Sequence, residues 1–146
     1  MPIRKRYFKK KGLIMVLFPL LLGSIIYYLF CPGVSFVKKI DAIVGVGIHF
    51  RITNSNWIIS LIRNYLLDFL WAYSLTWALF LLCDNMKYLN VFIVVFPFIL
   101  GLLFELMQKT KMVHGTADVF DVVAEIVGIV VANNIIKVEV RNEKVD

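Results

Sequence analysis

The amino-acid sequence predicts an all-α integral membrane protein: a bundle of four transmembrane helices with a long extracytoplasmic loop after the first helix. Two observations lead to this fold class. Of 146 residues, 60% are hydrophobic, and the mean hydropathy is +0.81. The apolar residues also form long runs, whereas a soluble core alternates apolar and polar positions. The length suits one membrane domain, 1–146, for which we expect no cofactor.

The first twelve residues are basic and are predicted to form a cytoplasmic leader, 1–12. They hold six of the sixteen Lys and Arg residues and directly precede an apolar run. This position favours a topology determinant with some attraction to anionic lipids, so we expect no nucleic-acid partner. The apolar run predicts the first transmembrane helix, 13–30. It is retained in the mature protein because Cys31-Pro32-Gly33 makes a poor signal-peptidase site.

The longest segment without a predicted span covers residues 31–64. Its apolar patch, 42–50, is too short to cross a membrane, so it either lies at the interface or dips into the bilayer as a lid. Residues 56–64 have apolar side chains at helical spacing and predict a short interfacial helix, with Trp57 as its anchor at headgroup level.

Three further apolar runs predict transmembrane helices at 65–83, 89–107 and 118–136, followed by a solvated cytoplasmic tail, 137–146. Pro97 is expected to kink the third helix. Four spans place both termini on one side of the membrane. That side carries ten of the sixteen Lys and Arg residues, so the positive-inside rule predicts that both termini are cytoplasmic.

The two cysteines do not indicate a disulfide or a metal site. Cys31 and Cys83 end the first and second apolar runs, so the predicted topology puts them on opposite sides of the membrane. Carboxylates and one His could hold a divalent ion, but no HExxH or comparable spacing exists, and we expect no metal. No GxSxG motif supports a serine hydrolase.

Four carboxylates lie within the apolar runs: Asp68, Glu105, Asp121 and Glu125. Inserting a charged side chain at the bilayer centre costs roughly 2.5–3.5 kcal/mol on insertion scales. Carboxylates at such positions therefore suggest a functional role. The predicted topology places all four in the outer leaflet, because one helix begins there, the next ends there and the last begins there.

Helical phase predicts that these acids face the bundle interior. Asp121 and Glu125 share a stripe with small residues that would let a neighbouring helix approach closely. In the third helix Glu105 is close in phase to Gln108, and in the second Asp68 is close to Asn64 and Trp71. The predicted packing residues are Gly101, Ala124, Gly128 and Ala132.

Several of these residues have a simpler structural explanation. Asp118 and Asp121 could serve only as the N-cap and N3 residues of the fourth helix, and Asp68 could be a first-turn acid. Glu125 is too deep to cap. Arg63 and His114 are the preferred cationic partners, although His114 could be an ordinary loop residue. The predicted ligand-binding residues are Asp68, Glu105, Asp121, Glu125, Arg63, Asn64, Gln108, His114 and Trp71; no catalytic residue is assigned.

The same residues carry a family resemblance. An E-x-x-Q pair (Glu105, Gln108), a short polar loop and a G-T-x-D-x-x-D-x-x-x-E-x-x-G run (115–128) resemble the signature of VanZ-like membrane proteins. The N-Y-L-x-D-x-x-W-A run (64–72) resembles their earlier polar motif. The likeness covers about half of the chain, with Glu125 where the family pattern has Asn. The resemblance implies a bacterial envelope protein of about four helices in the cytoplasmic (inner) membrane, in a family named for low-level teicoplanin resistance.

Three functions are compatible with these observations. In the first, the outer-leaflet acids recognise or act on a lipid headgroup or an amphiphilic envelope or antibiotic ligand, with membrane lipids as partners. In the second, the chain is a non-enzymatic subunit or assembly partner of a larger envelope complex. The third is a proton- or ion-coupled carrier, which is less favoured because the acids lie toward one side. Whether the protein is an enzyme stays open.

Overall fold

The computed structural model describes residues 2–32, 34–45, 47–49, 61–83, 89–112 and 118–145. Within these ranges, side chains are described except at 2–9, 63, 89–90 and 143–145. The described chain is helical and contains no strand, which confirms the predicted all-α class.

Among the described residues, four helices are long and apolar enough to cross a membrane. They are α1 (Pro2–Phe30), α4 (Leu67–Leu82), α5 (Leu89–Lys109) and α6 (Val119–Val145), and the π-helical turn η1 (Ile62–Leu66) leads directly into α4. This number of candidate spans agrees with the sequence prediction.

Two of these helices extend beyond their predicted apolar cores. α1 already begins at Pro2, a residue whose fixed φ suits the first helical position. α6 continues through the charged segment 137–145, which has no Gly or Pro to end it. α5 runs continuously through Pro97. α1 and α6 therefore continue through the charged segments near the two chain ends and do not stop where the apolar runs stop.

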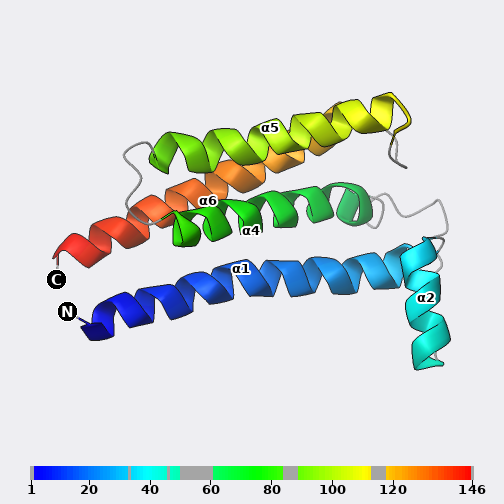
Figure 1. Ribbon diagram of the computed structural model, residues 1–146, viewed down its shortest axis with the longest axis horizontal. Coiled ribbons are helices and arrows are strands. Elements are labelled where there is room, and N and C mark those ends of the chain that lie inside the picture. Colours follow the sequence, from blue (N-terminus) through cyan, green and yellow to red (C-terminus); the bar gives the residue numbers. More distant parts are fainter. Residues whose placement is uncertain are drawn as a thin grey trace.

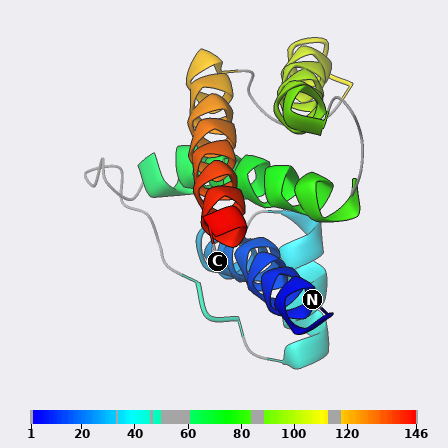
Figure 2. The ribbon, with the colours of Figure 1, turned by 90° about the vertical axis from the view of Figure 1, so that its left-hand side faces the viewer.

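The central helix of the bundle is α4, which packs against α1 on one side and against α5 and α6 on the other. Figures 1 and 2 show this arrangement from two directions. Both chain ends lie at the same end of the bundle (Figure 1), as expected for four antiparallel crossings. Cys83, which is a free cysteine, follows α4 at that end.

A helix that the sequence analysis did not predict lies within the long segment after α1. α2 (Ser35–Val44) is set across the end of α1 (Figure 1). It is amphipathic and ends at Gly45, whose φ of 73° is the left-handed conformation typical of a helix C-cap. The predicted apolar patch therefore begins inside a helix at Ala42. Most of the predicted interfacial helix 56–64, including Trp57, lies outside the described residues.

Close contact between α4 and α6 depends on a glycine. A Cβ added at Gly128 would lie 2.5 Å from the carbonyl oxygen of Phe69, closer than side chains pack. Further along the same two helices lies the hydrophobic core, which also includes a residue of α5. Its buried residues are Tyr73, Trp77, Ile93, Ala132 and Ile136.

Candidate functional site

The four predicted acids come together where α4, α5 and α6 meet, at the end of the bundle opposite the termini. Electrostatic repulsion acts between Asp68 and both Asp121 and Glu105, and between Glu125 and the other three carboxylates. We call Asp68, Glu105, Asp121 and Glu125 the acidic cluster. Three different helices contribute to it, so the cluster is a product of the tertiary fold.

Glu125 is the most deeply placed member of the acidic cluster. Only 4% of the residue is exposed, and its Oε2 atom has no hydrogen-bond partner in the described structure. The carboxylate lies directly against Gly101 of α5, where even a methyl group would overlap it. Gly101 therefore provides the space that lets a carboxylate enter the α5–α6 interface.

The start of α6 is capped by residues from two helices. Asp118 is the N-cap: its Oδ1 accepts the backbone N–H of Phe120 at 3.0 Å. The N–H of Asp118 is donated to Oε2 of Glu105 at 3.0 Å. In a capping box this acceptor is the N3 side chain, here Asp121. Because Glu105 of α5 takes that role, Asp121 is a first-turn residue of α6 but not its capping-box acceptor.

Tyr65 is a contributor that the sequence analysis missed. Its hydroxyl donates to Oδ2 of Asp118 at 3.2 Å, which connects the π-helical turn to the start of α6. Its ring also contacts Phe120 edge-on, with ring centroids 6.0 Å apart. A π-helical turn in front of α4 is the kind of irregularity often found at functional sites. The motif N-Y-L contained the residue, but no periodicity indicated its partner.

Among the described side chains, no cation forms an ion pair with the acidic cluster. None of its four carboxylates forms an ion pair there, since the ion pairs found are Lys11–Glu139 and His49–Asp41. Lys109 and Glu105 both line a small cavity of about 360 Å³ between α5 and α6. Both predicted partners lie outside this description: His114 entirely, and Arg63 in its side chain. Across the described residues no three His, Cys, Asp or Glu groups are arranged to hold a metal ion.

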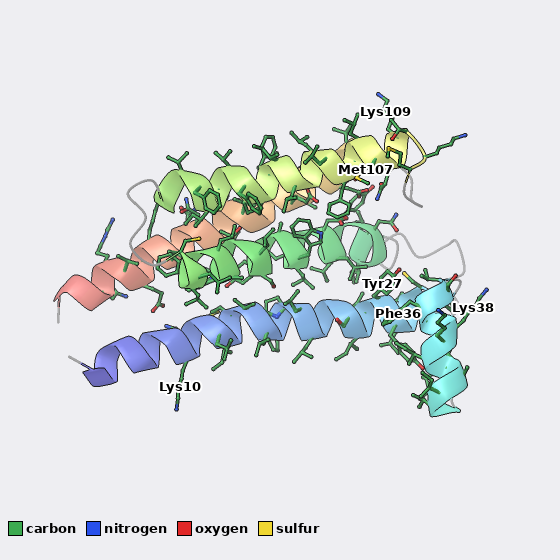
Figure 3. The ribbon with its side chains drawn as sticks, viewed as in Figure 1. Lys10, Tyr27, Phe36, Lys38, Met107 and Lys109 are labelled. Carbon is green, nitrogen blue, oxygen red and sulfur yellow. The ribbon has the colours of Figure 1, made fainter. Side chains whose placement is uncertain are left out.

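Beside the acidic cluster lies an apolar groove of about 610 Å³ formed by α1, α2 and α4. Aromatic side chains from all three helices line it, including Tyr27, Phe36 and Trp71. Figure 3 shows Tyr27 and Phe36 where α1 meets α2. Among its described lining residues Asp68 alone carries a charge. Asp68 therefore belongs both to the groove and to the acidic cluster.

A second set of polar side chains, Tyr28, Asp41 and His49, attaches α2 to the end of α1. The Tyr28 hydroxyl donates to Oδ1 of Asp41 at 2.7 Å, and Nε2 of His49 lies 2.8 Å from Oδ2. The other ring nitrogen of His49 is 3.1 Å from the carbonyl oxygen of Tyr28. The hydrogen bonds from Tyr28 and His49 lower the pKa of Asp41 below its usual value. The amphipathic spacing of 35–44 and Gly45 could have predicted α2, but not these partners.

The remaining predicted residues occupy several environments. Trp71 lines the groove and meets Phe104 edge-on at 6.3 Å between ring centroids. Gln108 has a buried Oε1 atom without a hydrogen-bond partner, one turn beyond Glu105. Asn64 is exposed in η1. Of the predicted packing residues, Ala132 is fully buried in the core, and Ala124 is half-buried.

Comparison with known proteins adds no family to these observations: no family model matches the chain, and neither a curated protein nor a solved structure matches it.

Proposed function

We propose that this chain is a VanZ-like protein of the bacterial cytoplasmic membrane that binds an amphiphile, either a lipid or an amphiphilic antibiotic. The apolar tail lies in the groove formed by α1, α2 and α4, and the headgroup reaches the acidic cluster. With both termini in the cytoplasm, this site faces the outer leaflet. One observation carries the proposal: Asp68 lines the apolar groove and also interacts electrostatically with the other three acids.

The dimensions and composition of the groove suit such a ligand. Small-molecule sites typically enclose about 300–1,000 Å³ and are apolar with a few polar groups that fix orientation. The groove, at about 610 Å³, is lined by aromatic and aliphatic side chains with Asp68 at one position. An acyl chain gains favourable contacts along such a surface, and the carboxylates bind hydroxyl or cationic groups of the head.

Filling the groove tests the proposal. Gly23 lines the groove, and a Cβ added there would meet its nearest neighbours at 3.8 Å, an ordinary contact. Gly23→Ala should therefore leave the groove open, whereas Gly23→Phe should occupy it. The protein would be reconstituted in nanodiscs containing a phospholipid with a photoreactive diazirine in its acyl chain, and cross-links would be mapped by mass spectrometry.

We expect cross-links to groove residues of α1, α2 and α4 in the wild type and in Gly23→Ala, and their loss in Gly23→Phe. Cross-links to the outward face of α5 report ordinary lipid contact and should be equal in all three proteins. If groove cross-links are absent from the wild type, or if they persist unchanged in Gly23→Phe, the groove does not hold an amphiphile.

A further inference from the structure

The acidic cluster contains more hydrogen-bond acceptors than the neighbouring chain satisfies. The backbone N–H of Asp118 donates a hydrogen bond to Glu105, and the Tyr65 hydroxyl donates one to Asp118. At this end of the bundle, the buried polar atoms without a partner in the described structure are both acceptor oxygens, Glu125 Oε2 and Gln108 Oε1. A buried polar atom is costly unless it is hydrogen-bonded, so both oxygens point to a ligand that donates.

The negative charge of the acidic cluster also favours a ligand that donates hydrogen bonds, provided that the ligand is positively charged. Four carboxylates repel one another across α4, α5 and α6, and no described Lys or Arg pairs with them. A ligand that brings positive charge reduces this repulsion and supplies the missing donors together. An anionic headgroup would increase the repulsion, and a neutral sugar would supply donors without charge.

From these two observations we propose that the acidic cluster binds a primary ammonium group on the headgroup of a membrane lipid. The proposal rests on the amphiphile-binding function above and specifies its headgroup. An ammonium group has three N–H donors on one small centre. Glu125 and Asp68 are the principal acceptors: Asp68 lies at the groove, and Glu125 lies deeper against Gly101.

The site geometry favours this group over other cations. The described residues offer no cluster of three metal-ligating side chains, which argues against a bare metal ion. Glu125 is almost completely buried and packs against the backbone of α5, so a donor that reaches it must be compact. Of the acidic cluster, Asp68 lines the apolar groove, which can hold the acyl chain of the same molecule.

Two phospholipids that differ only in the methylation of the headgroup nitrogen provide the test. Phosphatidylethanolamine and phosphatidylcholine carry the same formal charges, but the methylated nitrogen of choline has no N–H. Each would compete, with identical acyl chains, against the photoreactive lipid for cross-linking in the groove. We expect phosphatidylethanolamine to compete about tenfold more strongly, the change expected when a charge-assisted hydrogen bond is lost. Phosphatidylglycerol, which is anionic, should be the weakest competitor.

Substitutions in the acidic cluster test which residues produce the preference for ethanolamine lipids over choline lipids. Glu125→Gln and Asp68→Asn should each abolish the discrimination between ethanolamine and choline lipids while groove cross-linking continues. Asp121→Asn, a less buried member of the cluster, serves if Glu125→Gln does not fold. The matched control is Glu139→Gln, which removes a carboxylate from α6 at the opposite end, where it pairs with Lys11. It should keep the wild-type preference.

The outcomes separate the two proposals. If groove cross-linking occurs but choline and ethanolamine lipids compete equally, the ammonium proposal is wrong, and amphiphile binding stands. A stronger competition by phosphatidylglycerol would likewise overturn it. If the wild type shows no groove cross-linking, both proposals fail together. A preference that survives in all three acidic-cluster variants would show that other residues recognise the headgroup.

Discussion

Gly101 and Glu125 form a pair in which a missing side chain makes room for a buried carboxylate. Gly101→Ala would place a methyl group on that carboxylate. Overpacking of this kind costs about 1–3 kcal/mol, although alanine otherwise stabilises a helix interior by roughly 0.5–1 kcal/mol relative to glycine. We expect Gly101→Ala to lower the thermal unfolding temperature in detergent, and Gly23→Ala, which has space, to leave it equal or raise it.

A double variant separates overpacking from a general effect of the substitution. In Gly101→Ala/Glu125→Ala the carboxylate is gone, so the added methyl group has space, and the unfolding temperature should lie above that of Gly101→Ala alone. A simple addition of the two single-variant effects would show that the two side chains do not compete for one volume.

Asp41 couples the attachment of α2 to pH. Its pKa is lowered because Tyr28 and His49 hydrogen-bond to the carboxylate. A depressed pKa in the folded state means that Asp41 contributes stability above the unfolded-state value, about 3.9, and loses it as pH falls through the lower folded-state pKa. Hydrogen-exchange protection of the α2 backbone should therefore persist at neutral pH and fall below about pH 4.

Asp41→Asn supplies the comparison for this pH effect. The amide can keep one hydrogen bond but cannot carry the charge, so protection of α2 should be weaker at neutral pH and should lose its acid transition. Exchange in the α4–α6 core serves as the internal control. An acid transition that survives in Asp41→Asn would assign the pH effect to another group.

At the level of elements, the contact between α4 and α6 should tolerate an added methyl group less well than the contact between α1 and α4. The Cβ of Gly128→Ala would lie 2.5 Å from the Phe69 carbonyl oxygen, and that of Gly12→Ala would lie 2.6 Å from a Leu81 methyl carbon. The distances are similar, but a leucine side chain can rotate, whereas a helix carbonyl moves only with its helix. We expect Gly128→Ala to destabilise by about 1–3 kcal/mol and Gly12→Ala by much less.

Equilibrium unfolding in mixed micelles would compare these two variants directly. Equal losses would mean that α4 and α6 can separate slightly without cost, and that Gly128 does not determine their spacing. A larger loss in Gly12→Ala would contradict the prediction outright.

The elements differ in how far the sequence could predict them. The spans and the acidic cluster follow from hydropathy, topology and helical phase, which are local or nearly local properties. Thus Asp68, Glu105, Asp121 and Glu125 could be grouped without coordinates. The groove could not, because residues of α1, α2 and α4 line it together and its shape depends on how α2 is set across the end of α1. The link from Tyr28 to Asp41 and His49, and the capping of α6 by Glu105, pair residues whose partners no periodicity indicates.

For the whole molecule, orientation decides which leaflet the site faces. α2 lies at one end of the bundle, together with the start of α4, the end of α5 and the start of α6, which carry the acidic cluster (Figure 1). Both chain termini lie at the other end. The two cysteines mark these ends: Cys31 follows α1 beside α2, and Cys83 follows α4 at the end with the termini. Since the basic residues favour cytoplasmic termini, Cys31 should face the outside and Cys83 the cytoplasm.

Single-cysteine variants make this orientation measurable. In intact cells, a membrane-impermeant maleimide should label Cys83→Ser, which keeps Cys31, and should fail to label Cys31→Ser until the membrane is permeabilised. Labelling of both variants after permeabilisation controls for thiol access. The opposite pattern would turn the acidic cluster toward the cytoplasm, where it would meet inner-leaflet lipids. Because all four acids move together on inversion, the headgroup preference would be unchanged, and only the leaflet that supplies the lipid would differ.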